Sequence, residues 1–252
     1  MRWEEEAIVL ARRPHGETSL LVSVLTPSHG RHVGLVKGGR SSRYRGQIEP
    51  GNRVQAVWQA RLSEHLGNFG VELMRDRAGP LLQDGLALSA LSALCALVEA
   101  CLAEREPHPA VYAALDIAID ALEDPEIWPV LMVRFELGLL AELGFGLELG
   151  RCAVTGRTDT LTHVSPRTGR AVAAEVAARY EGRLLPLPAF LLGGQAGPRG
   201  PLEVLDGLRL TGSFLNRWLF EPQDRELPPP RAALPDRLAR HFGLAEAPAG
   251  AG

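Results

Sequence analysis

Residues 7–46 read AIVLARRPHGETSLLVSVLTPSHGRHVGLVKGGRSSRYRG and decide how the N-terminal part of the chain folds. Apolar runs at 7–11, 20–25 and 33–36 have the length of strands rather than of helices. Pro-His-Gly at 14–16 and Pro-Ser-His-Gly at 27–30 separate these runs with residues that favour tight turns. The stretch therefore predicts an antiparallel meander.

A cationic loop, residues 37–46, follows the third predicted strand. It carries Lys37, Arg40, Arg43 and Arg45 around Tyr44, on a backbone rich in glycine and serine. Cations beside an aromatic ring suit a phosphate backbone with a base that stacks. The alternative is a solvated basic turn, which is common on protein surfaces.

The distribution of charge favours nucleic acid. Residues 1–75 hold 11 Lys and Arg against 7 Asp and Glu, residues 76–150 hold 3 against 13, and residues 151–252 hold 13 against 10. The formal net charge of −3 conceals this asymmetry. The acidic middle block would repel DNA, so it favours internal packing or a protein partner.

The length of 252 residues and the hydrophobic content of 46% suit a multidomain protein. The N-terminus lacks a signal-peptide pattern, and the apolar stretches 86–103 and 130–149 contain charged residues, so both predict buried helices. Cys95, Cys101 and Cys152 form no close pair, as expected of reduced thiols. We expect a cytoplasmic protein that does not enter membranes.

Strand patterns continue at 53–61 and 70–75, which gives about five strands within residues 1–80. Five short strands fit a small closed β-barrel of the oligonucleotide-binding type, the OB-fold. Tyr44, Trp58 and Phe69 are available to stack on bases. Trp58 suits the core equally well, whereas Tyr44 has few apolar neighbours in sequence, so Tyr44 is the preferred stacking residue.

From residue 84 the apolar period lengthens to that of helices, which predicts helices over 86–102, 111–122 and 129–143 in an all-helical domain, residues 81–150. Asp124 and Pro125 resemble a start signal for the third helix, and Gly144 a stop signal.

Arg134 lies within the third predicted helix and has two interpretations. It either pairs with Glu136 or with a carboxylate of a neighbouring helix, or it anchors the carboxylate of an acidic, hydrophobic-tipped partner peptide.

Residues 151–182 form a compact segment with the look of a degenerate zinc ribbon. Cys152 is followed by Thr155 where a second cysteine would stand, the second half has no cysteine, and His163 is the one other soft ligand nearby. Structural zinc needs four ligands, so we expect no metal cofactor. Residues 183–252 predict a linker at 184–201, helices at 211–220 and 234–242 that complete the helical domain, and a disordered tail.

Catalytic motifs are missing from the sequence. It has no P-loop, dinucleotide-binding, nucleophile-elbow or zinc-protease motif, and its histidines are scattered. We therefore expect a binding protein rather than an enzyme.

Four strings together resemble the RecO family of bacterial recombination-repair proteins. They are Ala7-Ile-Val-Leu with Arg13-Pro-x-x-Glu-Thr-Ser-Leu-Leu, Gly30-Arg with Val36-Lys-Gly-Gly-Arg-Ser, Arg134-Phe-Glu-Leu-x-Leu-Leu-x-x-Leu-Gly-Phe-Gly, and Val164-Ser-Pro-x-x-Gly-Arg-Ala. The resemblance spans residues 5–182, and residues 183–252 match loosely.

The resemblance implies a multidomain α+β fold: an N-terminal five-stranded OB-fold barrel, then an all-helical domain with a small inserted zinc module, degenerate here. It implies a recombination mediator that binds single- and double-stranded DNA, anneals complementary strands and, with RecR, helps RecA replace single-strand-binding protein. The resemblance implies that Arg31, Lys37 and Arg40 contact DNA. The residue pattern adds Arg43, Tyr44 and Arg45 as further DNA-binding candidates. Arg134 would meet the acidic tail of single-strand-binding protein, and the protein would act at the nucleoid. The alternatives are an OB-fold RNA-binding factor and a small-molecule enzyme.

Overall fold

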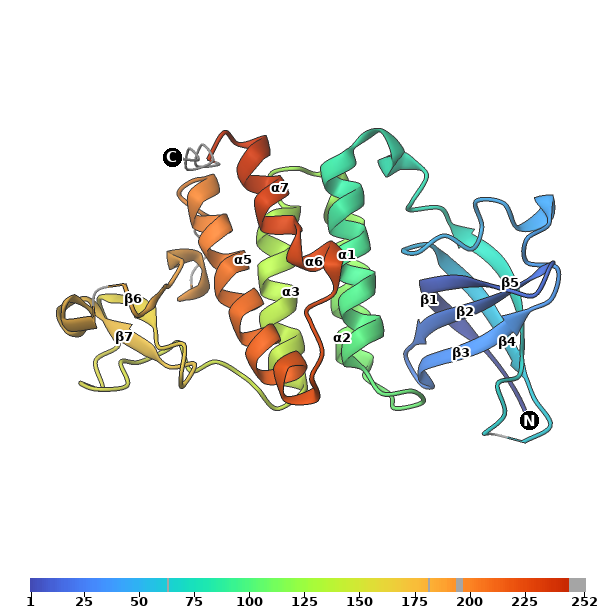
Figure 1. The fold of residues 1–252 in the computed structure, drawn as a ribbon, viewed down its shortest axis with the longest axis horizontal. Helices are drawn as coiled ribbons and strands as arrows, with labels where there is room; N and C mark the ends of the chain where they lie inside the picture. Colours follow the sequence, from blue (N-terminus) through green and yellow to red (C-terminus); the bar gives the residue numbers. More distant parts are fainter. Residues whose placement is uncertain (63, 181, 194–196, 245–252) are drawn as a thin grey trace, which may run out of the picture. The chain divides into compact units, whose positions relative to one another are not determined.

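The computed structural model describes residues 1–62, 64–180, 182–193 and 197–244 (Figure 1). The chain divides into two compact units, Met1–Pro125 and Glu126–Gly252.

The first unit begins with five strands: β1 (Arg2–His15), β2 (Ser19–Thr26), β3 (Gly30–Val36), β4 (Arg53–Gln59) and β5 (Asn68–Arg75). They form one closed sheet in the order β1-β2-β3-β5-β4. All neighbours are antiparallel except β3 and β5, which are parallel. The five-stranded sheet predicted for residues 1–80 is confirmed.

Strand β1 closes the barrel because it has neighbours along both edges. Its first half pairs with β4, as in Trp3 with Trp58, and its second half pairs with β2. The register shifts between Val9 and Ala11, and such a bulge bends a strand and increases its twist. One long strand can therefore turn from one neighbour to the other.

Trp58 belongs to the barrel core, where it is 2% exposed among the inward-facing side chains of the strands. Its indole N–H donates to the carbonyl oxygen of Leu66, 3.0 Å away. Gly67 passes over the ring at φ +69°, and a Cβ there would lie 2.3 Å from Trp58 Nε1. The alternative left open by the sequence is thus decided in favour of packing.

Two helices complete the first unit, α1 (Gly85–Cys101) and α2 (Pro109–Asp120). The carboxylate of Asp84 caps α1 by accepting from the backbone N–H groups of Leu86 and Ala87. Helix α1 packs on β1, and Cys95 is buried there, which raises the pKa of its thiol to about 12. Cys95 is a core residue as predicted, whereas Cys101 is only partly buried.

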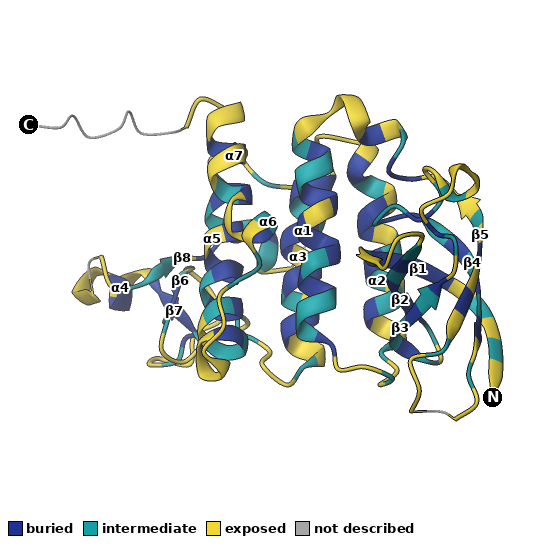
Figure 2. Cartoon of the chain, turned by 45° about the vertical axis from the view of Figure 1, so that its right-hand side comes forward, coloured by how far each residue is buried: buried dark blue, intermediate teal, exposed yellow. Residues whose placement is uncertain are grey.

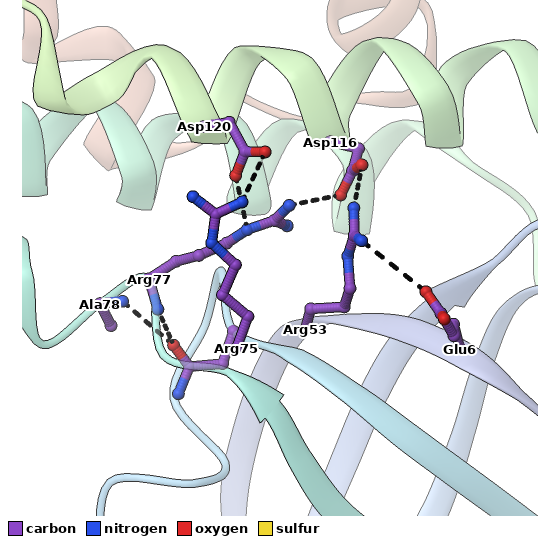
Figure 3. A network of polar contacts seen from close by, with 8 residues as sticks. Glu6, Arg53, Arg75, Arg77, Ala78, Asp116 and Asp120 are labelled. Carbon is purple, nitrogen blue, oxygen red and sulfur yellow. Dashed lines mark hydrogen bonds and ion pairs between the residues drawn. The ribbon is translucent and has the colours of Figure 1, made fainter.

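An ion-pair network joins α2 to the barrel (Figure 3). Arg53 pairs with Asp116, and Arg77 reaches both Asp116 at 2.6 Å and Asp120 at 2.8 Å. Arg75 adds a bond of 2.9 Å to Asp120. Burial raises the pKa of Asp116, but hydrogen bonds from Arg53 and Arg77 outweigh it and lower the pKa overall, so Asp116 stays ionised.

This network explains why the units divide inside the predicted helical domain. Helix α2 is bonded to the barrel, whereas the third predicted helix lies in the second unit. The domain boundaries predicted from the sequence stay a prediction.

The second unit contains α3 (Trp128–Glu142), α5 (Pro201–Leu215), α6 (Pro229–Ala232) and α7 (Leu234–His241). Helix α5 packs on both α3 and α7, and buried residues, dark blue in Figure 2, run along α3 and α5. Helix α3 starts later than the signal at Asp124 predicted, because Asp124 ends the short 3-10 turn Ala121–Glu123. Gly144, at φ +85°, follows its end as predicted. Among the described residues, no helix has both the length and the apolar character to cross a membrane.

A buried ion pair links three of these helices. Glu136 of α3 is fully buried and accepts from Arg231 of α6 at 2.7 Å and from the hydroxyl of Thr211 of α5. Arg231 also donates to the carbonyl oxygen of Leu208 at 2.6 Å. Removing one partner of such a pair leaves a buried charge without compensation.

A small three-stranded sheet, in the order β7-β6-β8, lies between α3 and α5 in sequence. It consists of β6 (Leu161–Val164), β7 (Ala171–Ala173) and β8 (Leu185–Pro186), with the short helix α4 (Ala174–Ala177) after β7. The prediction of a linker over 184–201 is wrong for its first part, because β8 pairs with β6 and Phe190 is buried. The predicted disordered tail, residues 245–252, lies outside the described residues.

His32 of β3 is an ionisable group inside the barrel. It is 4% exposed, it packs edge-on against Trp3 and Trp58, and neither ring nitrogen has a hydrogen-bond partner among the described residues. Burial, with the charges of Arg105 and His29, lowers the pKa of His32 to about 4. The imidazole is therefore neutral in the folded protein.

We predict that His32 makes stability fall in acid. Because its pKa is lower in the folded protein than in the unfolded chain, the unfolded chain binds more protons between pH 6.5 and about 4. The free energy of unfolding should fall as pH drops through this window, by at most about 3 kcal/mol from this residue. Urea unfolding at several pH values measures it, with His32→Leu as the comparison. An equal slope for wild type and variant would contradict the assignment.

Candidate nucleic-acid interface

The cationic loop leaves β3 through a tight turn and is tied to the barrel at its start. Gly38 adopts φ +67°, the N–H of Gly39 donates to the carbonyl oxygen of Val36, and the N–H of Arg40 donates to that of Thr18 at 2.9 Å. The short helix η1 (Ser42–Tyr44) follows. The loop thus projects from the strand end with a defined backbone path.

Asn52 fixes the other end of the loop. Its side chain is fully buried, and its Nδ2 donates to the carbonyl oxygens of Gly46 at 2.8 Å and Gln47 at 3.2 Å. Its Oδ1 accepts from the backbone N–H groups of Arg77 and Ala78 at 2.9 and 3.0 Å. Sequence reasoning missed Asn52, which sits in a loop that reads as an ordinary turn.

The loop cations face solvent. Lys37, Arg40, Arg43 and Arg45 are all exposed. Arg40 donates to the carbonyl oxygen of Glu17 at 2.9 Å, which holds one end of its guanidinium against the neighbouring turn. The structure therefore brings these four cations onto one short loop, where they can neutralise phosphates.

Tyr44 is less open than its sequence neighbours suggested. It is half-buried and packs against the barrel core, while the guanidinium of Arg43 lies 5.5 Å from its ring centre. The other two aromatic candidates are core residues, since Trp58 and Phe69 are 2% and 4% exposed. Tyr44 is thus the one of the three that retains exposed surface.

Arg31 differs from the loop cations because its side chain is partly buried and has partners within the protein. Its side chain is 14% exposed, its Nε–H donates to the carbonyl oxygen of Leu102 at 2.8 Å, and its Nη1 lies 3.4 Å from Glu99. Glu104 is a further partner at 3.7 Å. These contacts hold the C-terminal end of α1 to β3, so they favour a structural role for Arg31.

A cavity of about 570 Å³ lies beside the loop in the first unit. Arg45 and Gly46 form one wall, and Leu82, Leu88 and Leu91 provide apolar surface. Glu49 and Asp76 also line the cavity, so two carboxylates face it beside the one arginine, and it does not by itself favour an anionic ligand.

Arg134, in the second unit, is exposed on α3. Its Nη2 lies 3.4 Å from the carbonyl oxygen of Phe190. Glu136 is committed to Arg231 and Thr211, so the local pair that the sequence allowed is not formed. Within the described ranges no ion pair of Arg134 is found with any carboxylate, so its exposed guanidinium can bind a carboxylate from outside.

The residues around Cys152 do not fit zinc. Cys152 is buried and its Sγ accepts from the N–H of Ala173 at 3.3 Å. Burial raises its pKa, but hydrogen bonds from Thr155 and backbone N–H groups outweigh it and lower the pKa to about 7. His163 is paired with the hydroxyl of Thr162 at 2.9 Å. Throughout the described part of the chain, no three His, Cys, Asp or Glu side chains are grouped to hold a metal ion.

Comparison with known families gives two matches. The model described as Recombination protein O N terminal matches residues 1–75, and the one described as Recombination protein O C terminal matches residues 82–227. The second match extends well past residue 182, so the loose likeness expected of the C-terminal part was an underestimate.

Curated relatives cover nearly the whole chain. The DNA repair protein RecO of Rhodospirillum centenum is 53% identical over 242 residues, covering 95% of this chain and 96% of the relative. The DNA repair protein RecO of Rhodospirillum rubrum is 49% identical over 245 residues, covering 95% and 97%. That of Phenylobacterium zucineum is 48% identical over 239 residues, covering 95% and 98%.

Proposed function

Since the chain belongs to the RecO family, we propose that it is a DNA repair protein that mediates recombination by binding single- and double-stranded DNA and annealing complementary strands. The observation that carries the proposal is the cationic loop, which presents four exposed cations on a fixed backbone. The three relatives are all named for DNA repair, and their names give no support to the RNA-binding alternative.

The barrel with its loop acts as an OB-fold in this proposal. A closed five-stranded barrel with a basic loop at a strand end is typical of OB-folds that bind single strands. Lys37, Arg40, Arg43 and Arg45 neutralise phosphates and so reduce repulsion between two strands, while Tyr44 offers a partly exposed ring to a base. Arg31 supports the site from β3 through its contacts with α1.

The mechanism requires no covalent step. Positive charge lowers the free energy of bringing two polyanions together, and base pairing then supplies the stability of the product. We therefore propose a non-catalytic protein without a metal cofactor. Residues 151–182 would be a metal-free form of the zinc-ribbon module, in which strand pairing and the bonds to Cys152 replace the ion.

Membership of the family and the exposed position of Arg134 support a proposal about the partners. We propose that single-strand-binding protein docks its acidic C-terminal tail on α3, with Arg134 binding a carboxylate and the partly exposed Leu131, one turn earlier, contacting apolar side chains. RecR would be a direct partner and RecA an indirect one, loaded onto the DNA that this protein clears. Such work places the protein at the nucleoid.

Replacing Lys37, Arg40, Arg43 and Arg45 together by Ala should weaken single-stranded DNA binding by about tenfold or more and reduce the dependence of log affinity on log salt by up to about three. The fold should persist, because exposed charges contribute little stability.

Fluorescence anisotropy at several salt concentrations measures both quantities. The matched control replaces four exposed arginines outside the loop, Arg2, Arg61, Arg209 and Arg240, by Ala. Equal losses in the two variants would show that overall charge, and not the loop, controls binding.

Charge reversal in Arg134→Glu should weaken binding of an acidic tail peptide by about tenfold or more and leave DNA affinity unchanged, because the charged hydrogen bond is lost outside the loop. Titration of a labelled peptide measures the effect, with Arg209→Glu as the control. Unchanged peptide affinity would remove Arg134 from the docking site.

A further inference from the structure

The segment that resembles a degenerate zinc ribbon carries an excess of arginine that the proposed function leaves unused. Residues 151–184, which we call the arginine module, contain six arginines against three carboxylates. Arg157 pairs with Asp159, and Arg170 pairs with Glu148. Within the described ranges, no ion pair engages the other four, which are all exposed: Arg151, Arg167, Arg179 and Arg183.

Tyr180 stands between two of these arginines. It is 47% exposed at the end of the 3-10 turn Ala178–Tyr180, directly after Arg179. The backbone N–H of Arg183 donates to the carbonyl oxygen of Tyr180 at 2.9 Å, so the backbones of these two residues lie side by side. Residues 179–183 read Arg-Tyr-Glu-Gly-Arg, so Tyr180 follows one arginine directly and precedes another by three positions, and its ring is more exposed than that of Tyr44.

A cavity of about 450 Å³ adjoins this tyrosine. Its walls include Tyr180, the small side chains of Ala177 and Ala178, and the polar side chains of Thr162 and His163 on β6. A nucleobase is flat, with apolar faces and a polar edge. A hollow lined by an aromatic ring, alanine side chains, a hydroxyl and an imidazole matches such a group.

Charge selects the class of ligand. The preceding block, residues 76–150, has 13 carboxylates against 3 cations, whereas the arginine module is cationic. A polyanion would be attracted to the module and repelled from that block. Phosphates for the arginines and bases for the tyrosine and the cavity together indicate single-stranded nucleic acid, since a duplex keeps its base faces stacked.

We propose that the arginine module is a second binding site for single-stranded DNA, in which Tyr180 stacks on a base and Arg179 and Arg183 contact the flanking phosphates. The inference rests on the proposed function and deepens it. Each chain would hold one strand at the cationic loop in the first unit and the complementary strand at the module in the second, so that annealing needs both sites while binding of one strand needs only the loop.

The test compares four full-length proteins: wild type, Tyr180→Ala, Tyr180→Phe and the double variant Arg179→Ala/Arg183→Ala. Two readouts are taken, the affinity for one short labelled oligonucleotide and the rate of annealing of two complementary oligonucleotides. Thermal unfolding checks that each variant folds, and Arg209→Ala/Arg240→Ala is the charge-matched control.

We expect Tyr180→Ala and the double arginine variant to lower the annealing rate by about tenfold while single-strand affinity stays within about twofold of wild type. Tyr180→Phe should anneal like wild type, because the ring is kept.

Wild-type annealing rates in both Tyr180→Ala and the arginine variant would overturn the second site and leave the proposed function standing. Failure of the wild-type protein itself to bind or anneal DNA would instead overturn the proposed function, and the second site with it. Loss of acidic-peptide binding in the arginine variant, with annealing intact, would assign the module to a protein partner and so also overturn the second DNA site.

Discussion

The buried side chain of Asn52 is the contact on which the first unit depends most. One amide satisfies four backbone groups, at Gly46, Gln47, Arg77 and Ala78. It therefore joins the end of the cationic loop to the segment that leads into α1. The same segment carries Arg77, whose guanidinium binds Asp116 and Asp120 of α2. Loop position and helix position share a single anchor, and an unsatisfied buried group there costs about 1–3 kcal/mol.

This arrangement separates two kinds of arginine. Three arginines pair with carboxylates of α2, so their charge is already compensated within the first unit: Arg53, Arg75 and Arg77. The cations of the loop have no such carboxylate partners in the described structure, and they remain available to phosphates. A count of basic residues would miss this difference, because Arg53 and Arg75 lie in the same cationic block as the loop, residues 1–75. What distinguishes them is the acidic face of α2.

The sequence predicted what depends on local pattern. The apolar periods located the five strands and the helices α1, α2 and α3. What it could not predict depends on tertiary partners. Arg31 reads like the loop cations, yet Glu99 and the end of α1 take up its guanidinium.

Burial and pairing account for the other differences. Tyr44 packs against a core formed by residues far along the chain. Glu136 is two positions from Arg134 but pairs with Arg231, 95 residues away. Asn52 follows a glycine in what reads as a turn, and no local signal distinguishes a buried amide from an exposed one. The second half of residues 151–184 likewise gave no hint of the cavity beside Tyr180, since its walls come from strand, helix and turn.

Lys37 permits the most direct test of the claim that the cationic loop binds DNA, because it is the sole lysine of the sequence. Acetylation with an amine-specific reagent, followed by mass spectrometry, reports separately on Lys37 and on the N-terminal amine of Met1, which serves as an internal reference. Single-stranded DNA should slow acetylation of Lys37 severalfold and leave that of Met1 unchanged. Equal rates at Lys37 with and without saturating DNA would contradict the account and place the DNA elsewhere on the protein.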